Sequence, residues 1–520
     1  MSKGKKQNKL GLMSLVLMIL TAIFGFGNTT VAYDQMGYAS IIWYIFGALV
    51  FFLPVSLMFA EYGSTFSSAK GGIYSWLKES IGERLAFIGT FIWLSSWIIW
   101  MISTSSKVWI PFSNIIFGTD KTQTWHLFGI FTPMQTIGIL GMAWILIITL
   151  CATHGFDSIA KIANIGGVLS IALPLIFAIL SVIVWVLNKG QLAEPVNGAK
   201  SFIQSPNPLF VTPIAIMSFV VYAIFAYGGM ESIGGVVDKV KNPTKTFPRG
   251  VIIAAIIMAV IYSGSIFLVG ITANWHSVVG KSSVNLGNIT YVLMNNLGYV
   301  FAKTFGFSAG SAMEFGRFMA RVAGLGMFIP YLGSFFVLIY SPIKSFIEGS
   351  NPDLWPKKVV QLNKHGMPGF AMWIQAFVVV AVIFVISFSG NNAQQFYLIL
   401  TDMANISTTF PYLFLVGAFP FFKKLKNVPR PFVFYKNRII TNIMVAIILI
   451  VLVLGIGFTA VQPILIHDYT TAFWTIAGPI AFALVGWIMY EYNSRHSKKV
   501  AKKTIIDNKK RVRNANSFFV

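Results

Sequence analysis

Long uninterrupted apolar blocks constrain the possible folds of this chain more than any other feature of its sequence. The stretches 439–461 and 469–490 contain no charged residue. A helix that crosses the hydrocarbon core of a membrane needs about 20 apolar residues, and it satisfies its own backbone hydrogen bonds. Of the 520 residues, 56% are hydrophobic and only 11% are charged, unlike a soluble protein. The sequence therefore predicts an all-α polytopic membrane protein.

Twelve apolar segments of this kind can be placed along the chain. We expect them at 11–34, 40–61, 85–114, 133–153, 164–187, 210–237, 249–273, 316–343, 369–388, 393–421, 439–461 and 469–490. The first is longer than the roughly 7–15 apolar residues of a signal peptide, so we interpret it as a span. The chain then divides into an N-terminus at 1–10, helices one to five within 11–187, helices six to ten within 188–421, helices eleven and twelve within 439–490, and a tail at 491–520.

The positive charge of the chain follows this topology. The net charge is +23, and most of the 39 Lys and Arg residues lie in alternate loops and at the two ends of the chain. Cytoplasmic loops of membrane proteins carry such an excess. We therefore predict that both termini are cytoplasmic, and that the basic tail contacts lipid and is otherwise disordered. The distribution of positive charge therefore indicates the membrane topology, and it does not indicate a nucleic-acid partner.

Cysteine and histidine give no sign of a metal or cofactor site. Cys151 is the only cysteine, which excludes an intramolecular disulfide, and we interpret it as a helix-packing residue. The six histidines are scattered in or near loops, and no P-loop motif occurs. The sequence therefore predicts no metal, no cofactor and no enzymatic centre.

Two glycine clusters lie inside apolar segments where Leu, Ile or Val would be expected. "AIFGFGN" occupies 22–28 in the first span, and "FAYGGMES" occupies 225–232 in the sixth. Helix six begins five spans after helix one. Because five is an odd number, helix six crosses the membrane in the opposite direction to helix one. Matching interruptions in two oppositely oriented halves are typical of inverted-repeat transporters with a site near the membrane midplane. Glycine also packs helices together, but the pair of clusters favours broken helices and a five-plus-five inverted repeat.

The two breaks predict a site for a zwitterion. If helix one breaks at Gly25-Phe26-Gly27, its second half begins with unpaired N–H groups, which favour a carboxylate. Carbonyl groups freed at the break in helix six can accept hydrogen bonds from an ammonium group. One substrate that carries both groups is an amino acid. The predicted substrate-binding residues are Gly25, Phe26, Gly27, Asn28, Phe225, Ala226 and Gly228.

Three charged residues inside the predicted spans are candidates for coupling or gating, because charge in a membrane is costly and usually functional. Glu231 follows the second glycine cluster, and its alternative role is to bond the broken backbone for structural reasons only. Asp402 could meet a substrate cation or carry a proton, or it could cap a helix distortion. Lys107 could act at the site, or its side chain could extend to the membrane interface.

The chain resembles the amino acid–polyamine–organocation superfamily of permeases. The resemblance rests on "AEYGSTFSSAKGGIYSWLKESIGERLAFI" at 60–88 and "FAYGGMESIGGVVDKVKNPTKTFPRG" at 225–250. Within that superfamily the chain is most similar to inner-membrane permeases of the bacterial glutamate/GABA-antiporter branch. The resemblance implies a LeuT-like fold with helices eleven and twelve outside the repeat. It also implies that helices three, eight and ten contribute to the site.

Further residues take their meaning from this resemblance. Phe225 matches the position where relatives place an aromatic gate, although it could simply be a packing residue. Phe26 replaces the serine of a Gly-Ser-Gly motif that relatives often carry, which narrows the site. Gly167 stands where some relatives have a lysine that replaces a sodium ion, so coupling through such a lysine is not expected and exchange is favoured.

The sequence thus predicts a secondary transporter of amino acids or related amines in the cytoplasmic membrane. It would work by alternating access, as an exchanger or linked to protons, with the bilayer and a small-molecule substrate as its partners. The alternative is an ion channel or another ion-conducting membrane protein. A channel should carry a repeated selectivity filter, and the sequence has none.

Overall fold

A computed structural model describes residues 9–66, 72–154, 157–231, 240–390 and 392–516. These residues form helices joined by loops. The strand-like pairing within them is one isolated parallel bridge between Leu10 and Val240, where the N–H of Lys241 donates to the carbonyl of Leu10 at 2.9 Å. This bridge ties the start of the chain to the segment that follows the sixth apolar block.

The predicted all-α membrane architecture is confirmed. In the described part of the chain, nine helical segments are long and apolar enough to cross a membrane: Phe26–Thr65, Glu83–Phe117, Pro133–Thr153, Ile165–Leu187, Thr244–Thr272, Ala309–Gly349, Gly369–Ser387, Arg438–Leu465 and Tyr469–Arg495. Leu12–Thr21 and Pro213–Phe225 are apolar but shorter. Twelve spans, the inverted repeat and the division of the chain into halves stay predictions.

The first apolar segment is broken in two. Helix α1 covers Leu12–Ile23 and helix α2 covers Phe26–Met36. Phe24 and Gly25 are both extended, and the N–H of Phe24 closes α1 by donating to the carbonyl of Leu20. The prediction of a break was right, but its position at Gly25-Phe26-Gly27 was wrong by one residue, because Phe26 already has helical geometry and opens α2.

The sixth apolar segment also loses its helix at the glycines. Helix α11 covers Pro213–Phe225, and the hydroxyl of Thr212 caps it by accepting the N–H of Ala215 at 3.2 Å. A turn follows, in which Gly229 has a φ of +96° that L side chains rarely adopt. The structure describes this segment as far as Glu231 and resumes at Val240, before α13 (Pro243–Thr272).

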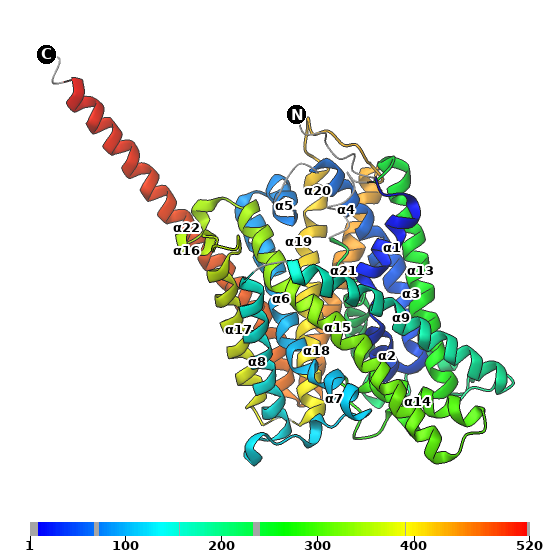
Figure 1. Cartoon of the computed structure of the whole chain (residues 1–520). Helices are drawn as coiled ribbons and strands as arrows, with labels where there is room; N and C mark the ends of the chain where they lie inside the picture. Colours follow the sequence, from blue (N-terminus) through cyan, green and yellow to red (C-terminus); the bar gives the residue numbers. More distant parts are fainter. Residues whose placement is uncertain (1–8, 67–71, 155–156, 232–239, 391, 517–520) are drawn as a thin grey trace, which may run out of the picture.

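Figure 1 shows how the helices are arranged in one bundle. Within the described residues the other α-helices, with the π-helical turn η2, are in chain order α3 (Ser40–Phe46), η2 (Gly47–Phe52), α4 (Leu53–Thr65), α5 (Ile73–Ile81), α6 (Glu83–Lys107), α7 (Trp109–Phe117), α8 (Pro133–Thr153), α9 (Asp157–Leu187), α10 (Lys200–Ile203), α14 (Ile289–Thr304), α15 (Ala309–Gly349), α16 (Lys357–Val360), α17 (Gly369–Ser387), α18 (Ala393–Thr409), α19 (Pro411–Gly417), α20 (Phe419–Phe422), α21 (Arg438–Leu465) and α22 (Tyr469–Asn516). Helix α15 packs against α9 and α14, and α18 packs against α6 and α22.

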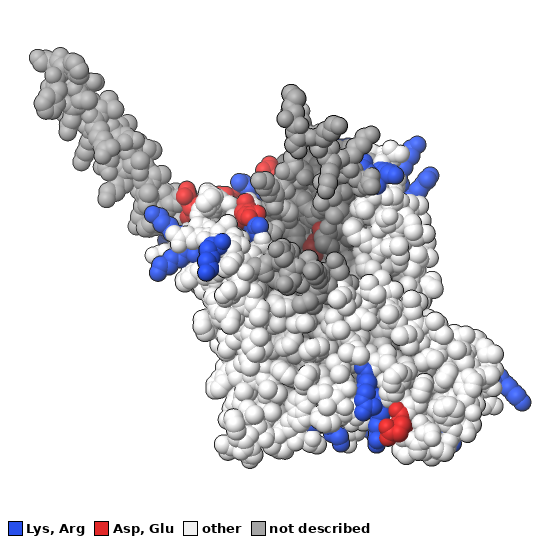
Figure 2. All heavy atoms as spheres, in the orientation of Figure 1, with Lys and Arg blue, Asp and Glu red and all other residues white. Residues whose placement is uncertain are grey.

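The surface has the charge distribution of a membrane protein. On the face drawn in Figure 2, Lys, Arg, Asp and Glu gather at the two ends of the bundle, and a belt without charged side chains separates them. Large apolar side chains are exposed in the helices of this belt, including Leu175 of α9 and Phe377 of α17. Exposed apolar surface of this extent is expected where lipid replaces water.

The basic tail differs from the prediction. We expected a tail that is otherwise disordered, but α22 continues without a break from the bundle to Asn516 (Figure 1). The segment 491–516 contains neither Gly nor Pro and is rich in Lys and Arg, and these residues have a good helix propensity. The tail therefore continues the last apolar helix.

Candidate functional site

A cavity of about 700 Å³ lies beside the two helix breaks. The first broken helix contributes Gly25, Phe26, Gly27 and Asn28, and the end of α11 contributes Phe225 and Gly228. Polar side chains come from α6 (Ser103, Thr104, Lys107), α9 (Ser170), α15 (Tyr331, Ser334) and α18 (Thr401, Asn405, Thr408). The structure therefore brings six of the seven predicted substrate-binding residues to one cavity. Helices α6, α15 and α18, which correspond to predicted helices three, eight and ten, also contribute to its lining, as the resemblance implies.

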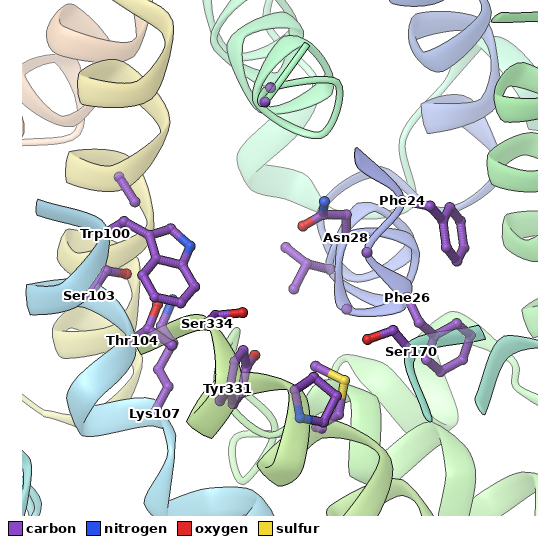
Figure 3. Close-up of a pocket in the computed structure, with 18 of the residues that line it drawn as sticks. Phe24, Phe26, Asn28, Trp100, Ser103, Thr104, Lys107, Ser170, Tyr331 and Ser334 are labelled. Carbon is purple, nitrogen blue, oxygen red and sulfur yellow. The ribbon is translucent and has the colours of Figure 1, made fainter. Parts of the chain in front are cut away.

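The start of α2 presents free hydrogen-bond donors at this cavity. The N–H of Asn28 is taken by the carbonyl of Gly25 at 3.0 Å. The N–H groups of Phe26 and Gly27 have no acceptor within the described residues. Because the positive end of a helix dipole lies at the same place, the start of α2 favours an anion. The side-chain amide of Asn28 extends into the cavity beside it (Figure 3).

The carbonyl groups at the end of α11 are less free than the sequence suggested. The carbonyl of Phe225 accepts the N–H of Gly228 at 2.8 Å, and the carbonyl of Ala226 accepts the hydroxyl of Tyr262 at 2.9 Å. Ala226 is buried and is the one predicted substrate-binding residue that does not line the cavity. A carbonyl oxygen has two lone pairs, so Phe225, which does line the cavity, can still accept a second bond.

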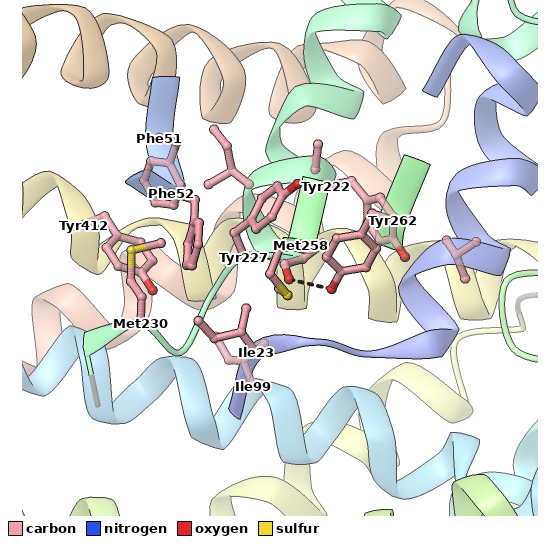
Figure 4. Packing of buried hydrophobic residues seen from close by; sticks show 14 of the residues in the cluster. Ile23, Phe51, Phe52, Ile99, Tyr222, Tyr227, Met230, Met258, Tyr262 and Tyr412 are labelled. Atoms are coloured by element: carbon pink, nitrogen blue, oxygen red, sulfur yellow. Dashed lines mark hydrogen bonds between the residues drawn. The ribbon is translucent and has the colours of Figure 1, made fainter. Parts of the chain in front are cut away.

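Tyr262 of α13 connects the two breaks. Its hydroxyl accepts the N–H of Gly25 at 3.3 Å and donates to the carbonyl of Ala226 at 2.9 Å. The ring is fully buried and packs against Phe24 and Tyr227, with centroids 4.9 and 5.5 Å away. Figure 4 shows Tyr262 among the buried side chains of this region, with Tyr227 and Met258 beside it. One side chain therefore satisfies a backbone donor of the first break and a backbone acceptor of the second.

Glu231 lies just behind the cavity, and both of its carboxylate oxygens accept hydrogen bonds. One carboxylate oxygen accepts Nε1 of Trp93 at 3.2 Å, and the other accepts the hydroxyl of Tyr412 at 2.8 Å. That hydroxyl also accepts the N–H of Gly229 at 3.2 Å. Glu231 does not line the cavity, but Tyr412 links its carboxylate to the turn that does.

Lys107 is turned inward. Its side chain lines the cavity, and Nζ donates to the hydroxyl of Thr401 at 2.8 Å. The alternative that Lys107 extends to the membrane interface was therefore wrong. Asp402 follows Thr401 and interacts electrostatically with Lys107, but it does not line the cavity. An acceptor deep in the bundle explains why the ammonium stays inside.

Gly167 also lines the cavity, and no atom lies within 4 Å of the position that a Cβ would occupy there. The described residues therefore leave room for a Cβ at this position.

Several residues at the site were missed in the sequence. Trp97, Trp100 and Thr104 recur at helical spacing with Lys107 on one face of α6, and Thr401, Asn405 and Thr408 do the same on α18. This spacing of three or four residues was the signal that could have found them. The helical spacing of Trp93, Trp97 and Trp100 favoured an interpretation as interfacial anchors. That interpretation was wrong, because Trp93 bonds Glu231 and the other two line the cavity. Tyr412 was missed, and it is a partner of Glu231. Asp34 of α2 is a further charged residue within the first predicted span, and it lies outside the cavity lining.

Within the described residues, no three His, Cys, Asp or Glu side chains are placed to hold one metal ion. The polar groups among the residues that line the cavity are backbone groups, hydroxyls, side-chain amides, indole N–H groups and one ammonium group.

Comparison with known proteins identifies relatives over nearly the full length of the chain. A family model described as "Amino acid permease" matches residues 10–497. The Inner membrane transporter YjeM of Salmonella typhimurium is 45% identical over 491 residues, which are 94% of this chain and 97% of that protein. The Glutamate/gamma-aminobutyrate antiporter of Lactococcus lactis is 22% identical over 455 residues, 87% of this chain and 84% of that protein. The Probable agmatine/putrescine antiporter AguD of the same species is 21% identical over 471 residues, 89% of each chain.

Proposed function

Because this chain belongs to the amino acid permease family, it is a transporter rather than an enzyme, and we propose that it exchanges amino acids across the cytoplasmic membrane by alternating access. Relatives named as antiporters for an amino acid and for amines leave both substrate classes open. The ion-channel alternative has no support from the family.

The start of α2 carries this proposal. The unpaired N–H groups of Phe26 and Gly27 face a cavity at the positive end of a half-helix. A carboxylate stabilises such a helix end by about 0.3–1 kcal/mol, and by up to about 2 kcal/mol when it is partly buried. The ammonium group of the same substrate can bond the carbonyl of Phe225 across the cavity. An amine without a carboxylate would leave the donors of α2 unused, so we favour amino acids over amines.

We further propose that Glu231 couples substrate occupancy to protonation. Its carboxylate bonds Tyr412, and Tyr412 bonds the N–H of Gly229 in the turn of the sixth segment. Movement of that turn on substrate binding changes the hydrogen bonds that Glu231 receives. A proton gained or lost by Glu231 would in turn favour one position of the turn, which is a reciprocal coupling.

Counterflow tests the proposed function. Purified protein is reconstituted into liposomes loaded with a pool of unlabelled amino acids, and uptake of each labelled amino acid and amine is measured from outside. We expect uptake that depends on the internal pool and is carried by amino acids. Uptake of amines alone would overturn the substrate class, and ion flux without any trans substrate would favour a channel.

A further inference from the structure

Lys107 is the one charged residue among the described residues that line the cavity. No Asp or Glu in the described chain joins that lining, since Glu231 lies behind Tyr412 and Asp402 lies outside the lining. The cavity wall therefore offers a substrate a positive charge from a side chain and no negative one. The three protons of a Lys ammonium can each be donated, and Thr401 takes one of them.

Unpaired polar atoms lie on the same wall. Nε1 of Trp97, Oδ1 of Asn405 and Oγ1 of Thr408 are buried and have no hydrogen-bond partner in the described part of the protein. All three residues line the cavity, and Asn405 and Thr408 are only 2% and 9% exposed. A buried polar group without a partner costs about 1–3 kcal/mol, so a ligand that bonds these atoms removes that cost.

This wall faces the helix break across the cavity. Figure 3 shows Trp100, Ser103, Thr104 and Lys107 of α6 on one side, with Asn28 and Phe26 of α2 on the other. At the near end of α18, Thr408 lies beside the sixth helix break, because a Cβ on Gly228 would come within 3.2 Å of its methyl group. Thr401, which bonds Lys107, lies seven residues away, or about 10 Å along the helix. A molecule held at the breaks can therefore reach along this wall toward Lys107.

We propose that α6 and α18 form a subsite for the substrate's side chain, and that Lys107 makes this subsite selective for acidic amino acids. This inference rests on the proposed function and names the substrate class of the same cavity. The α-carboxylate binds the start of α2, the hydroxyl of Thr408 bonds the same end of the substrate, and the side-chain carboxylate accepts a hydrogen bond from Lys107. Asn405 joins them when its amide turns the NH₂ group toward the ligand.

The charge of Lys107 disfavours basic and neutral amino acids as substrates. A basic amino acid would bring a second cation near Lys107, without a carboxylate in the described lining to bind it, and like charges repel strongly away from water. A neutral amide side chain can accept from Lys107, but it lacks the charge-assisted hydrogen bond that is about twice as strong. Asp402 interacts electrostatically with Lys107 but does not line the cavity.

The test compares acidic amino acids with their amides in counterflow. We expect the wild-type protein to exchange L-glutamate or L-aspartate in preference to L-glutamine, L-asparagine and L-lysine. Lys107→Met should lower the ratio of acidic to amide exchange at least about tenfold, as expected for a lost hydrogen bond to a charged group. Lys107→Arg, which keeps the charge, should retain most of the preference. Lys281→Met, at an exposed lysine of an outer loop, is the matched control and should leave the ratio unchanged.

A second readout keeps the test independent of transport rates. L-Glutamate should raise the melting temperature of the detergent-solubilised wild-type protein and should lose this effect in Lys107→Met. If Lys107→Met fails to fold, Thr401→Val removes the hydroxyl that holds Nζ of Lys107 at nearly constant shape, and it should lower the same ratio.

A wild-type preference for neutral or basic amino acids, or an unchanged ratio in Lys107→Met, would overturn the acidic subsite and leave the proposed exchange of amino acids intact. Failure of a folded wild-type protein to exchange any amino acid would instead overturn the proposed function, and the subsite with it.

Discussion

At the residue scale, the two glycines at the start of α2 have different surroundings. A Cβ on Gly25 would approach Nδ2 of Asn28 at 3.2 Å, and a Cβ on Gly27 would approach the terminal methyl of Met327 at 3.3 Å. Both neighbours are the ends of side chains that can move, and neither glycine has a positive φ. An alanine at either position is therefore compatible with the fold, while its methyl group enters the region where the substrate carboxylate is proposed to bind.

We predict that Gly25→Ala and Gly27→Ala reach the membrane and lose most substrate binding. The apparent affinity should fall about tenfold or more, because the added methyl group keeps the substrate carboxylate away from the two N–H donors. Binding is measured by counterflow at increasing substrate concentration. Gly457→Ala is the control, because Gly457 lies on the exposed face of α21 with no atom within 4 Å of a Cβ. Wild-type counterflow in both variants would mean that the glycines serve packing only.

Glu231 gives the second prediction at this scale. Glu231→Gln imitates the protonated carboxyl at nearly constant volume, and it can still accept from Trp93 or Tyr412. We expect the variant to fold and bind substrate, with a flatter pH dependence of uptake than wild type between about pH 5 and 8, the range of a working general acid or base. Uptake into proteoliposomes at a series of pH values measures this.

Tyr412→Phe removes the hydroxyl that links Glu231 to the N–H of Gly229, and it should also flatten the pH dependence. The control is Glu314→Gln, at an exposed carboxylate, which should keep the pH dependence of wild type. If Glu231→Gln has full activity and an unchanged pH profile, Glu231 has a structural role at most.

At the scale of elements, Tyr262 holds two broken helices together through a single hydroxyl. Tyr262→Phe keeps the buried ring but leaves the N–H of Gly25 and the carbonyl of Ala226 without their partner. We predict a loss of about 1–3 kcal/mol in stability, the cost of unsatisfied buried groups, and a lower melting temperature in detergent. Tyr492→Phe, on an exposed tyrosine of α22, should leave the melting temperature unchanged. Equal melting temperatures for the two variants would contradict the bridging role.

A buried ion pair anchors another element, the loop between α20 and α21. Glu61 at the end of α4 is fully buried, and one of its oxygens lies 2.6 Å from Nζ of Lys423. Its other oxygen accepts the N–H groups of Phe434 and Tyr435 at 2.8 and 2.7 Å. The carboxylate and the hydroxyl of Tyr435, which donates to the carbonyl of Pro54, therefore hold the loop against α4. Burial, with Glu61 close by, also raises the pKa of the Tyr435 hydroxyl, so it remains a donor.

We predict that Glu61→Gln destabilises the protein by roughly 3–5 kcal/mol, because removing one partner leaves a buried charge on Lys423. Thermal unfolding in detergent measures the change. The comparison is Glu314→Gln, whose partner Arg317 is exposed, and that change should cost about 1 kcal/mol or less. Similar costs for the two substitutions would show that the buried pair does not anchor the loop.

At the scale of the whole molecule, the charge distribution predicts the orientation in the membrane. Cysteines introduced at Lys121 and Lys200 should react with an impermeant thiol reagent added to intact cells, and a cysteine at Lys503 should not. The native Cys151 is exposed in the structure and is replaced by Ser in all three variants. External labelling at Lys503 would contradict cytoplasmic termini.

Much of this molecule could be predicted from local sequence. The apolar blocks predicted an all-α membrane protein, and the motifs at 60–88 and 225–250 predicted the permease family, which the family match confirms. The glycine clusters predicted both helix breaks within one residue, because glycine is unfavourable inside a helix and tolerates many other backbone conformations. These are properties of short segments.

Tertiary structure decided which side chains meet. Lys107 could reach the interface or the cavity by its position in α6, and the rotation of α6 and α18 about their axes brought it to Thr401 in the interior. Tyr262 is about 35 residues from one break and more than 200 from the other, yet its hydroxyl bonds the backbone at both. The sequence by itself determined where helices form and break, because those outcomes follow from hydrophobicity and backbone freedom over a few residues. The packing of helices determined the partners of each polar group, because a hydrogen bond depends on the positions of atoms that are far apart in the chain.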